Sequence, residues 1–309
     1  MRGRVEIALS LAVLAACVLT VGFSAAKFTD TEQNPQTVSA VADFVAPIAG
    51  ASVIAKTQGG AAGYIAAKGT YYVYASVTES GNPASGIASV IADVSVITSK
   101  QTSVPLIAGS YTAGGVSYNY RSAQLTADST LTAGSKSYTL ALADSAGNSR
   151  SQSFSVTVDN GPFAGSSFAT GDVAGGTEGK PEKGDTVTFT FTKAPEPGSI
   201  VSGWDGSGTK SVTVSITDNA SNDGLSVSGA TIGTVALNGD FTDKGVTFSE
   251  SSMSLSGSTV TIVLGTVSGS AKTNTKKVKP VWTPSASVFD QAWNACSTAN
   301  VNGAEAKQF

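Results

Sequence analysis

The sequence predicts an all-β protein with two β-sandwich domains in tandem. Apolar and β-branched residues alternate with polar residues in short runs, which is the period of a strand with one buried face. Clusters of Gly, Asn and Asp separate these runs, and these residues favour turns. After residue 26, no segment repeats its apolar residues with the 3.6-residue period of a helix. Many short strands at this spacing are typical of sandwiches.

The N-terminal end has the pattern of a secretory signal peptide. Two arginines precede an almost wholly apolar stretch over residues 7–21, small residues occupy positions 24–26, and Lys27 opens a polar segment. We therefore expect residues 1–26 to be removed by cleavage between Ala26 and Lys27. The remaining chain would then be secreted or displayed at the cell surface.

Two alternatives to cleavage remain open. Residues 5–26 are long enough to span a bilayer, so the segment could stay in place as a membrane anchor. Residues 14–17, Leu-Ala-Ala-Cys, resemble a lipobox, which would make Cys17 the lipid-bearing residue, although an apolar stretch would then follow the anchor. Either alternative would tether the same β domains to a membrane.

The first expected domain covers residues 45–160 and follows an extended N-terminal segment at 27–44. The expected strands of this domain lie at residues 70–77, 87–97, 138–143 and 154–158. The turn at 144–148, Asp-Ser-Ala-Gly-Asn, would join the last two strands into a hairpin.

The second expected domain covers residues 185–300. Residues 161–184 contain two prolines and many glycines without a long apolar run, so we expect a linker there. The expected strands of the second domain lie at residues 187–191, 212–216, 225–227, 232–235, 246–248 and 260–264. A helix is expected only near 287–299, and residues 301–309 are expected to form a C-terminal tail.

The first domain resembles the bacterial Ig-like (Big-type) domains of exported surface proteins. The resemblance rests on Ser-Gly-Ile-Ala-Ser-Val at 85–90 and on the hairpin from 138 to 159 with its Asp-x-Ala-Gly-Asn turn. It implies an Ig-like sandwich that acts as a spacer or binding module and carries no catalytic residue.

Two further stretches resemble exported proteins. Residues 26–32 and 38–43 are similar to the start of camelysin/TasA-type matrix-fibre proteins, which implies fibre formation through the segment 27–44. Residues 184–191, together with Gly-Trp-Asp-Gly at 203–206, look like a module common in exported Gram-positive proteins. This second likeness implies a location and no activity.

Composition limits the function classes. The net charge is −3, without the basic stripe that nucleic-acid binding needs. The chain has no histidine, which excludes Ser-His-Asp and Cys-His catalysis and imidazole-based zinc sites. After residue 26, Cys296 is the single cysteine, so no internal disulfide can form. No nucleophile and base stand out as a pair, so we expect no enzyme and no catalytic residue.

Three residues are candidate binding groups. Asp218 and Asp223 lie in Asn/Gly-rich turns whose oxygens could hold calcium, although Asp also favours turns on its own account. Trp204 lies in a Gly-rich turn and is the candidate exposed ring for a ligand such as a glycan. Trp282 and Trp293 are expected to pack in the interior.

The sequence therefore favours a non-enzymatic structural or adhesion protein, secreted or at the cell surface, which could also be a fibre or matrix subunit. The alternative is an extracellular glycan- or calcium-binding module. Partners would be other surface or matrix proteins, wall glycans or further copies of the chain. Nucleic acid is not expected, and a membrane would be reached only through the N-terminal segment.

Overall fold

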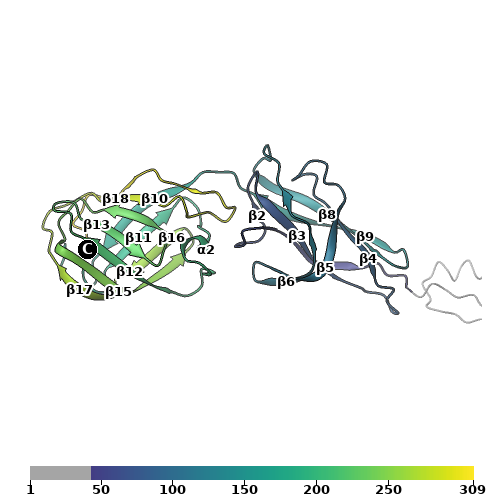
Figure 1. The fold of residues 1–309 in the computed structure, drawn as a ribbon, viewed down its shortest axis with the longest axis horizontal. Coiled ribbons are helices and arrows are strands. Elements are labelled where there is room, and N and C mark those ends of the chain that lie inside the picture. The colour runs from purple at the N-terminus through teal and green to yellow at the C-terminus, as the bar shows by residue number, and fades with distance from the viewer. Residues whose placement is uncertain (1–42) are drawn as a thin grey trace, which may run out of the picture.

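The computed structural model describes residues 43–309. The predicted signal peptide, its cleavage site at Ala26 and Lys27, and nearly all of the segment 27–44 lie outside the described residues. Within residues 43–309, the regular structure is nearly all β, and the single helix is α2 (Pro197–Ile200). The all-β prediction is confirmed. Figure 1 shows two β lobes in series, each built on one curled sheet.

The N-terminal lobe is a sheet with the strand order β1-β3-β6-β5-β4-β8-β9-β2, and β7 pairs with β3. The strands are β1 (Ile48–Lys56), β2 (Tyr64–Ile65), β3 (Thr70–Thr78), β4 (Ile87–Asp93), β5 (Val104–Ala113), β6 (Val116–Ser122), β7 (Leu125–Thr126), β8 (Gly134–Asp144) and β9 (Ser149–Val158). The predicted hairpin is present, because β8 and β9 pair in antiparallel register on either side of the 144–148 turn.

The two ends of this strand order meet, so the sheet closes around its main hydrophobic core. The Gly63 N–H donates to the Ile54 carbonyl at 2.8 Å, which links the start of β2 to β1. The Gln152 side chain bonds both the N–H and the C=O of Ala49, at 2.7 and 3.1 Å, which links β9 to β1. Alternate residues point inward, as the period of two predicts, and fill the core.

The C-terminal lobe has the strand order β19-β10-β11-β16-β15-β12-β13-β14-β18-β20, and β17 pairs with β15. The strands are β10 (Phe163–Gly171), β11 (Thr186–Phe191), β12 (Lys210–Thr217), β13 (Gly224–Ser228), β14 (Gly233–Ala236), β15 (Thr242–Ser256), β16 (Thr259–Val263), β17 (Thr266–Ala271), β18 (Val281–Pro284), β19 (Cys296–Ser297) and β20 (Val301–Asn302).

Aromatic packing closes this second sheet. Trp282 of β18 is fully buried and meets Phe189 and Phe191 edge-on, each at 5.1 Å between ring centroids. Gly165 of β10 lies so close that a Cβ there would come within 2.7 Å of both Trp282 and Val301. Only glycine permits this approach of β10 to β18 and β20.

The stretch 161–184, predicted to be a linker, contains the strand β10. Phe163 and Phe168 each keep only 2 % of their surface exposed, and β10 pairs with β11. Burial of these two rings outweighs the glycine content of the stretch. The connection between the two sheets is therefore residues 159–162, far shorter than expected.

Two further expectations about the C-terminal part are wrong. No helix forms at 287–299, where Asp290 instead accepts N–H bonds from Ala292 and Asn294 and closes a tight loop. Residues 301–309 are no free tail, because β20 lies within them and Phe309 is buried edge-on against Phe241 at 5.4 Å.

Candidate functional site

The short connection between the lobes is bound to the N-terminal lobe by Asn160. The Asn160 Oδ1 accepts the N–H of Ala67 at 2.7 Å, and its Nδ2 donates to the Leu131 carbonyl at 2.6 Å. The carbonyl oxygen and the NH₂ group of the Asn160 side chain therefore each make a hydrogen bond. Residues 159–162 are few and are held by these hydrogen bonds. The connection therefore leaves the two lobes little freedom to move relative to each other.

Asp159 and Lys193 bind the same connection to the C-terminal lobe. The Lys193 Nζ lies 2.8 and 2.9 Å from the two carboxylate oxygens of Asp159 and also donates to the Gly161 carbonyl at 2.8 Å. The Asn294 Nδ2 donates to the Asp159 carbonyl at 2.9 Å. A second carboxylate, Asp290, lies 3.4 Å from the same ammonium. These residues form an ionic network across the junction.

Lys56 and Glu196 form the second half of the junction. Lys56 ends β1 and donates to the Ala61 carbonyl of its own lobe and to the Gln291 carbonyl of the other, both at 2.6 Å. Glu196 accepts the Ala61 N–H at 2.8 Å. A Cβ at Gly60 would lie within 2.8 Å of the Glu196 carboxylate, so glycine is required at this position. We call residues Lys56, Ala61, Asp159, Lys193, Glu196, Asp290, Gln291 and Asn294 the joint.

Three charges of the joint are almost fully buried. Lys56, Glu196 and Asp290 keep 4 %, 5 % and 1 % of their surface exposed. Burial lowers the pKa of the Lys56 ammonium, and the negative charges of Glu196 and Asp290 oppose that shift. Removing one partner of such a set leaves the others buried without compensation, which is strongly destabilising. The joint therefore favours a fixed arrangement of the lobes.

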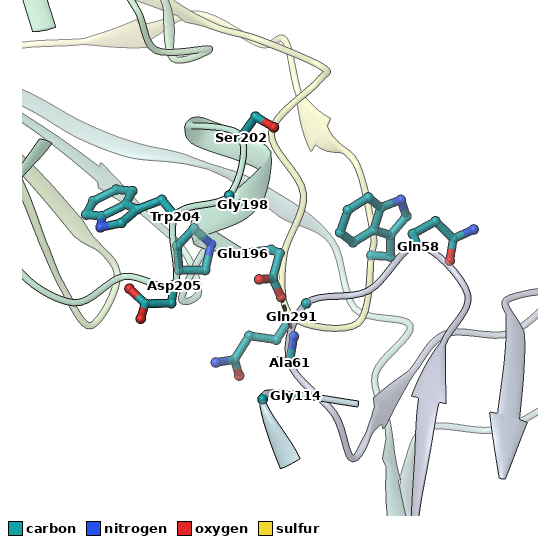
Figure 2. Close-up of a pocket in the computed structure, with 14 residues that line it drawn as sticks. Gln58, Ala61, Gly114, Glu196, Gly198, Ser202, Trp204, Asp205 and Gln291 are labelled. Carbon is teal, nitrogen blue, oxygen red and sulfur yellow. Dashed lines mark hydrogen bonds between the residues drawn. The ribbon is translucent and has the colours of Figure 1, made fainter. Parts of the chain in front are cut away.

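A cavity of about 610 Å³ lies beside the joint and is lined by both lobes. Figure 2 shows Gln58, Gln291 and Asp205 spread around the contact between Glu196 and Ala61. Five glycines also line the cavity and leave bare backbone on its walls. The cavity thus combines amides, carboxylates and an accessible main chain.

Trp293 is one of the two tryptophans that line this cavity. Its ring stacks on Phe289 with centroids 4.8 Å apart and planes 6° from parallel, and the residue is half-buried. Its φ is +73°, which costs roughly 1–2 kcal/mol for a residue with a Cβ. Strain of this kind persists only where the surroundings impose it, and it clusters at functional sites.

A second group lies where the described chain begins, at the end of the N-terminal lobe away from the joint (Figure 1). Carboxylate oxygens of Asp43, Glu79 and Asp144 lie within 4.8 Å of one another. The Glu79 Oε2 is buried and has no hydrogen-bond partner. Within residues 43–309, no Lys or Arg forms an ion pair with any of the three. Such oxygens could hold a hard cation.

The predicted calcium residues Asp218 and Asp223 lie in turns. Asp223 is fully buried, and its oxygens accept three backbone N–H bonds, from Asn219 at 3.0 Å, Phe241 at 2.6 Å and Thr242 at 3.0 Å. Asp218 accepts an N–H bond two residues on. Among residues 43–309 they join no group of three acids. The turn chemistry that was the alternative to calcium accounts for both.

Trp204 is buried, although the sequence predicted an exposed ring. It keeps 3 % of its surface exposed, and its Nε1 donates to the Ser207 carbonyl at 2.9 Å. Part of the residue reaches the cavity beside the joint. Packing against the C-terminal core explains the difference, because the Gly-rich turn folds back over that core.

The joint residues gave no local signal in the sequence. Lys56, Glu196 and Gln291 are separated by about a hundred residues or more, and each lies in a loop or at a strand end. Only Glu196 has a hint, because the prolines on either side of it restrict the backbone.

Neither a protein-family model nor a curated protein matches this chain. In the described part of the chain, no helix has the length and apolar character needed to cross a membrane.

Proposed function

We propose that this chain is a non-enzymatic structural or adhesion protein of the cell exterior, in which two Ig-like β-sandwiches act as a rigid spacer. The observation that carries the proposal is the joint, because the part-buried Lys193–Asp159 ion pair holds the short connection to the C-terminal lobe. The buried Lys56 and Glu196 add hydrogen bonds directly between the lobes. Domains linked in one chain move against each other by default, so a rigid spacer needs bonds between its lobes that oppose this motion.

The resemblances in the sequence support the same function. Residues 45–160 resemble Ig-like domains of exported surface proteins, and residues 1–26 have the pattern of a signal peptide. In the described residues, the two lobes follow one another with their far ends pointing apart (Figure 1). A protein held at its N-terminal side would therefore present its C-terminal lobe at a distance.

Small-angle X-ray scattering tests the spacer. We expect the wild type to fit one extended conformation. The double variant Lys56→Met, Lys193→Met should scatter as two lobes in many relative orientations, because carbonyls and carboxylates at the joint lose their donors. The matched control is Lys68→Met, Lys183→Met, which changes one exposed lysine in each lobe. Wild-type scattering that requires many orientations would refute the spacer.

Export and assembly are tested separately. The protein recovered outside expressing cells should have the mass of a chain that begins at Lys27. A mass that includes residues 1–26 would favour a membrane anchor. A mass that shows a lipid on Cys17 would favour a lipoprotein. For the fibre version, residues 27–44 would add as a strand to the sheet of a second copy. Negative-stain imaging should then show filaments that disappear when residues 27–42 are removed. A strictly monomeric protein would exclude the fibre version alone.

A calcium-binding module is the second candidate function. The buried Glu79 Oε2 without a partner favours it, because a cation would satisfy that oxygen together with Asp43 and Asp144. Calorimetry with calcium should show binding that weakens about ten-fold in Glu79→Gln. If calcium binding is lost in Asp218→Asn and not in Glu79→Gln, the site is the turn that the sequence predicted. No binding at about 5 mM calcium would remove this candidate.

A further inference from the structure

The cavity beside the joint has the size of a ligand site and walls from both lobes. Its volume of about 610 Å³ falls within the ~300–1,000 Å³ of small-molecule pockets. That is far more space than an ion needs. The lobes that form it are held together by the joint, so the cavity is pre-formed and a ligand need not order it.

One wall offers an aromatic face. Trp293 lines the cavity, its ring stacks in parallel on Phe289 with centroids 4.8 Å apart, and the residue is half-buried. The other two tryptophans, Trp204 and Trp282, keep only 3 % and 0 % of their surface exposed. A flat amphipathic ring held rigid at a cavity wall suits a ligand with an apolar flat face and a polar rim.

Most hydrogen-bonding groups of three polar side chains on the cavity walls have no partner within the protein's described residues. Within residues 43–309, the Gln291 side chain makes no hydrogen bond, and Gln58 makes one long contact of 3.5 Å, from its Nε2 to Thr70. Glu196 engages one carboxylate oxygen with Ala61, and no donor of the described residues bonds the other oxygen. The amides donate and accept, and the carboxylate accepts, which matches hydroxyl groups.

The charge of the site selects against anions. The carboxylates of Glu196 and Asp205 line the cavity. Lys56 lies behind this wall and directs its donors at two carbonyls. The described residues that line the cavity include no Lys or Arg, so an acidic ligand would meet negative charge without a cation on the wall to bind it.

We propose that this cavity binds an uncharged oligosaccharide, whose ring stacks on Trp293 and whose hydroxyls bond Gln58, Gln291 and Glu196. Sugars present an apolar face of C–H groups and a rim of hydroxyls, which is the pattern of these walls. The five glycines on the walls permit close approach of the ligand to the backbone. The site then lies at the junction of the lobes, where neither lobe alone supplies it.

Four neutral tetrasaccharides test the proposal: those of β-1,4-linked N-acetylglucosamine, β-1,4-glucose, α-1,4-glucose and β-1,4-mannose. Calorimetry on the full chain should give saturable binding of at least one. The bound sugar should also protect tryptophan fluorescence from quenching by acrylamide, because Trp293 is the accessible tryptophan. The tetramer of galacturonate, which carries carboxylates, should not bind.

Three variants locate the site. Trp293→Gly removes the ring, and glycine adopts a φ of +73° without strain, so binding should fall at least ten-fold in a folded protein. Gln58→Ala with Gln291→Ala should also weaken binding about ten-fold. The control, Gln124→Ala, changes an exposed glutamine of the N-terminal lobe away from the cavity and should bind as the wild type does.

The proposal is overturned if none of the four neutral sugars binds at about 5 mM. It is equally overturned if binding survives both the folded Trp293→Gly variant and the glutamine double variant, or if galacturonate binds more tightly than every neutral sugar. The spacer stands apart from this test, since scattering measures the joint without any ligand. A rigid protein that binds no sugar would refute the cavity proposal alone.

Discussion

At the residue scale, the thiol of Cys296 illustrates how burial controls reactivity. Cys296 is the free cysteine of the described residues and keeps 3 % of its surface exposed on β19. Burial raises the pKa of this thiol to about 11, although the Gly165 N–H partly opposes the shift. The reactive thiolate is therefore scarce at pH 8. In a Cys17→Ser background, we expect an aromatic disulfide reagent to label the native protein roughly 100-fold more slowly than the denatured protein.

The neighbouring Ser297 is exposed and supplies a control for this prediction. The double exchange Cys296→Ser, Ser297→Cys keeps one thiol on the same strand and moves it to the surface. That variant should be labelled at about the rate of the denatured chain. Fast labelling of native Cys296 would show that β19 opens readily.

At the element scale, Asp223 holds together the connections on either side of β13 and β14. Its carboxylate receives N–H bonds from Asn219 and from the start of β15 at Phe241 and Thr242. In Asp223→Ala, the buried donors of Phe241 and Thr242 would be left without an acceptor. We expect a loss of about 3 kcal/mol in the free energy of unfolding, measured by urea denaturation. Asp218→Ala, in the same turn but exposed, should change it by less than about 0.5 kcal/mol. Equal effects of the two variants would contradict this role.

At the scale of the whole molecule, the joint should respond to acid. Burial acts to raise the pKa of Asp159, but hydrogen bonds from Lys193 and Gly161 outweigh it and hold this pKa below its ordinary value of 3.8. A carboxyl with a lowered pKa in the folded protein stabilises the joint above pH 3.8, and that contribution is lost as the pH falls through the lowered pKa. Scattering curves should therefore be unchanged from about pH 8 to pH 4, and show freer lobes only below that range.

The variant Asp159→Asn isolates this effect, because it should show the freer lobes already at neutral pH. Circular dichroism at each pH checks that the strands persist. Loosening that begins between about pH 7 and pH 5 would show that other groups control the joint.

The strand pattern could be predicted because burial in a sheet is a local, alternating property. The hairpin of β8 and β9 follows from alternating Tyr138, Leu140 and Leu142 and from a turn rich in Gly and Asn. The sequence prediction was wrong where local composition favours one structure and tertiary packing imposes another. The glycines around β10 favoured the prediction of a linker, but Phe163 and Phe168 are buried in the C-terminal core. Strands far along the chain form that core, so the sequence near β10 does not reveal it.

The sequence by itself determined the all-β class and most strand positions, and it predicts the export that an N-terminal mass would test. The tertiary structure decided which side chains are accessible. Trp204, expected at the surface, is buried, while Trp293, expected in the interior, is only half-buried. Period and turn propensity act over a few neighbouring residues, whereas exposure depends on which distant segment packs against a residue. The contact between Lys56 and Gln291 exists only because the short connection places the two lobes next to each other.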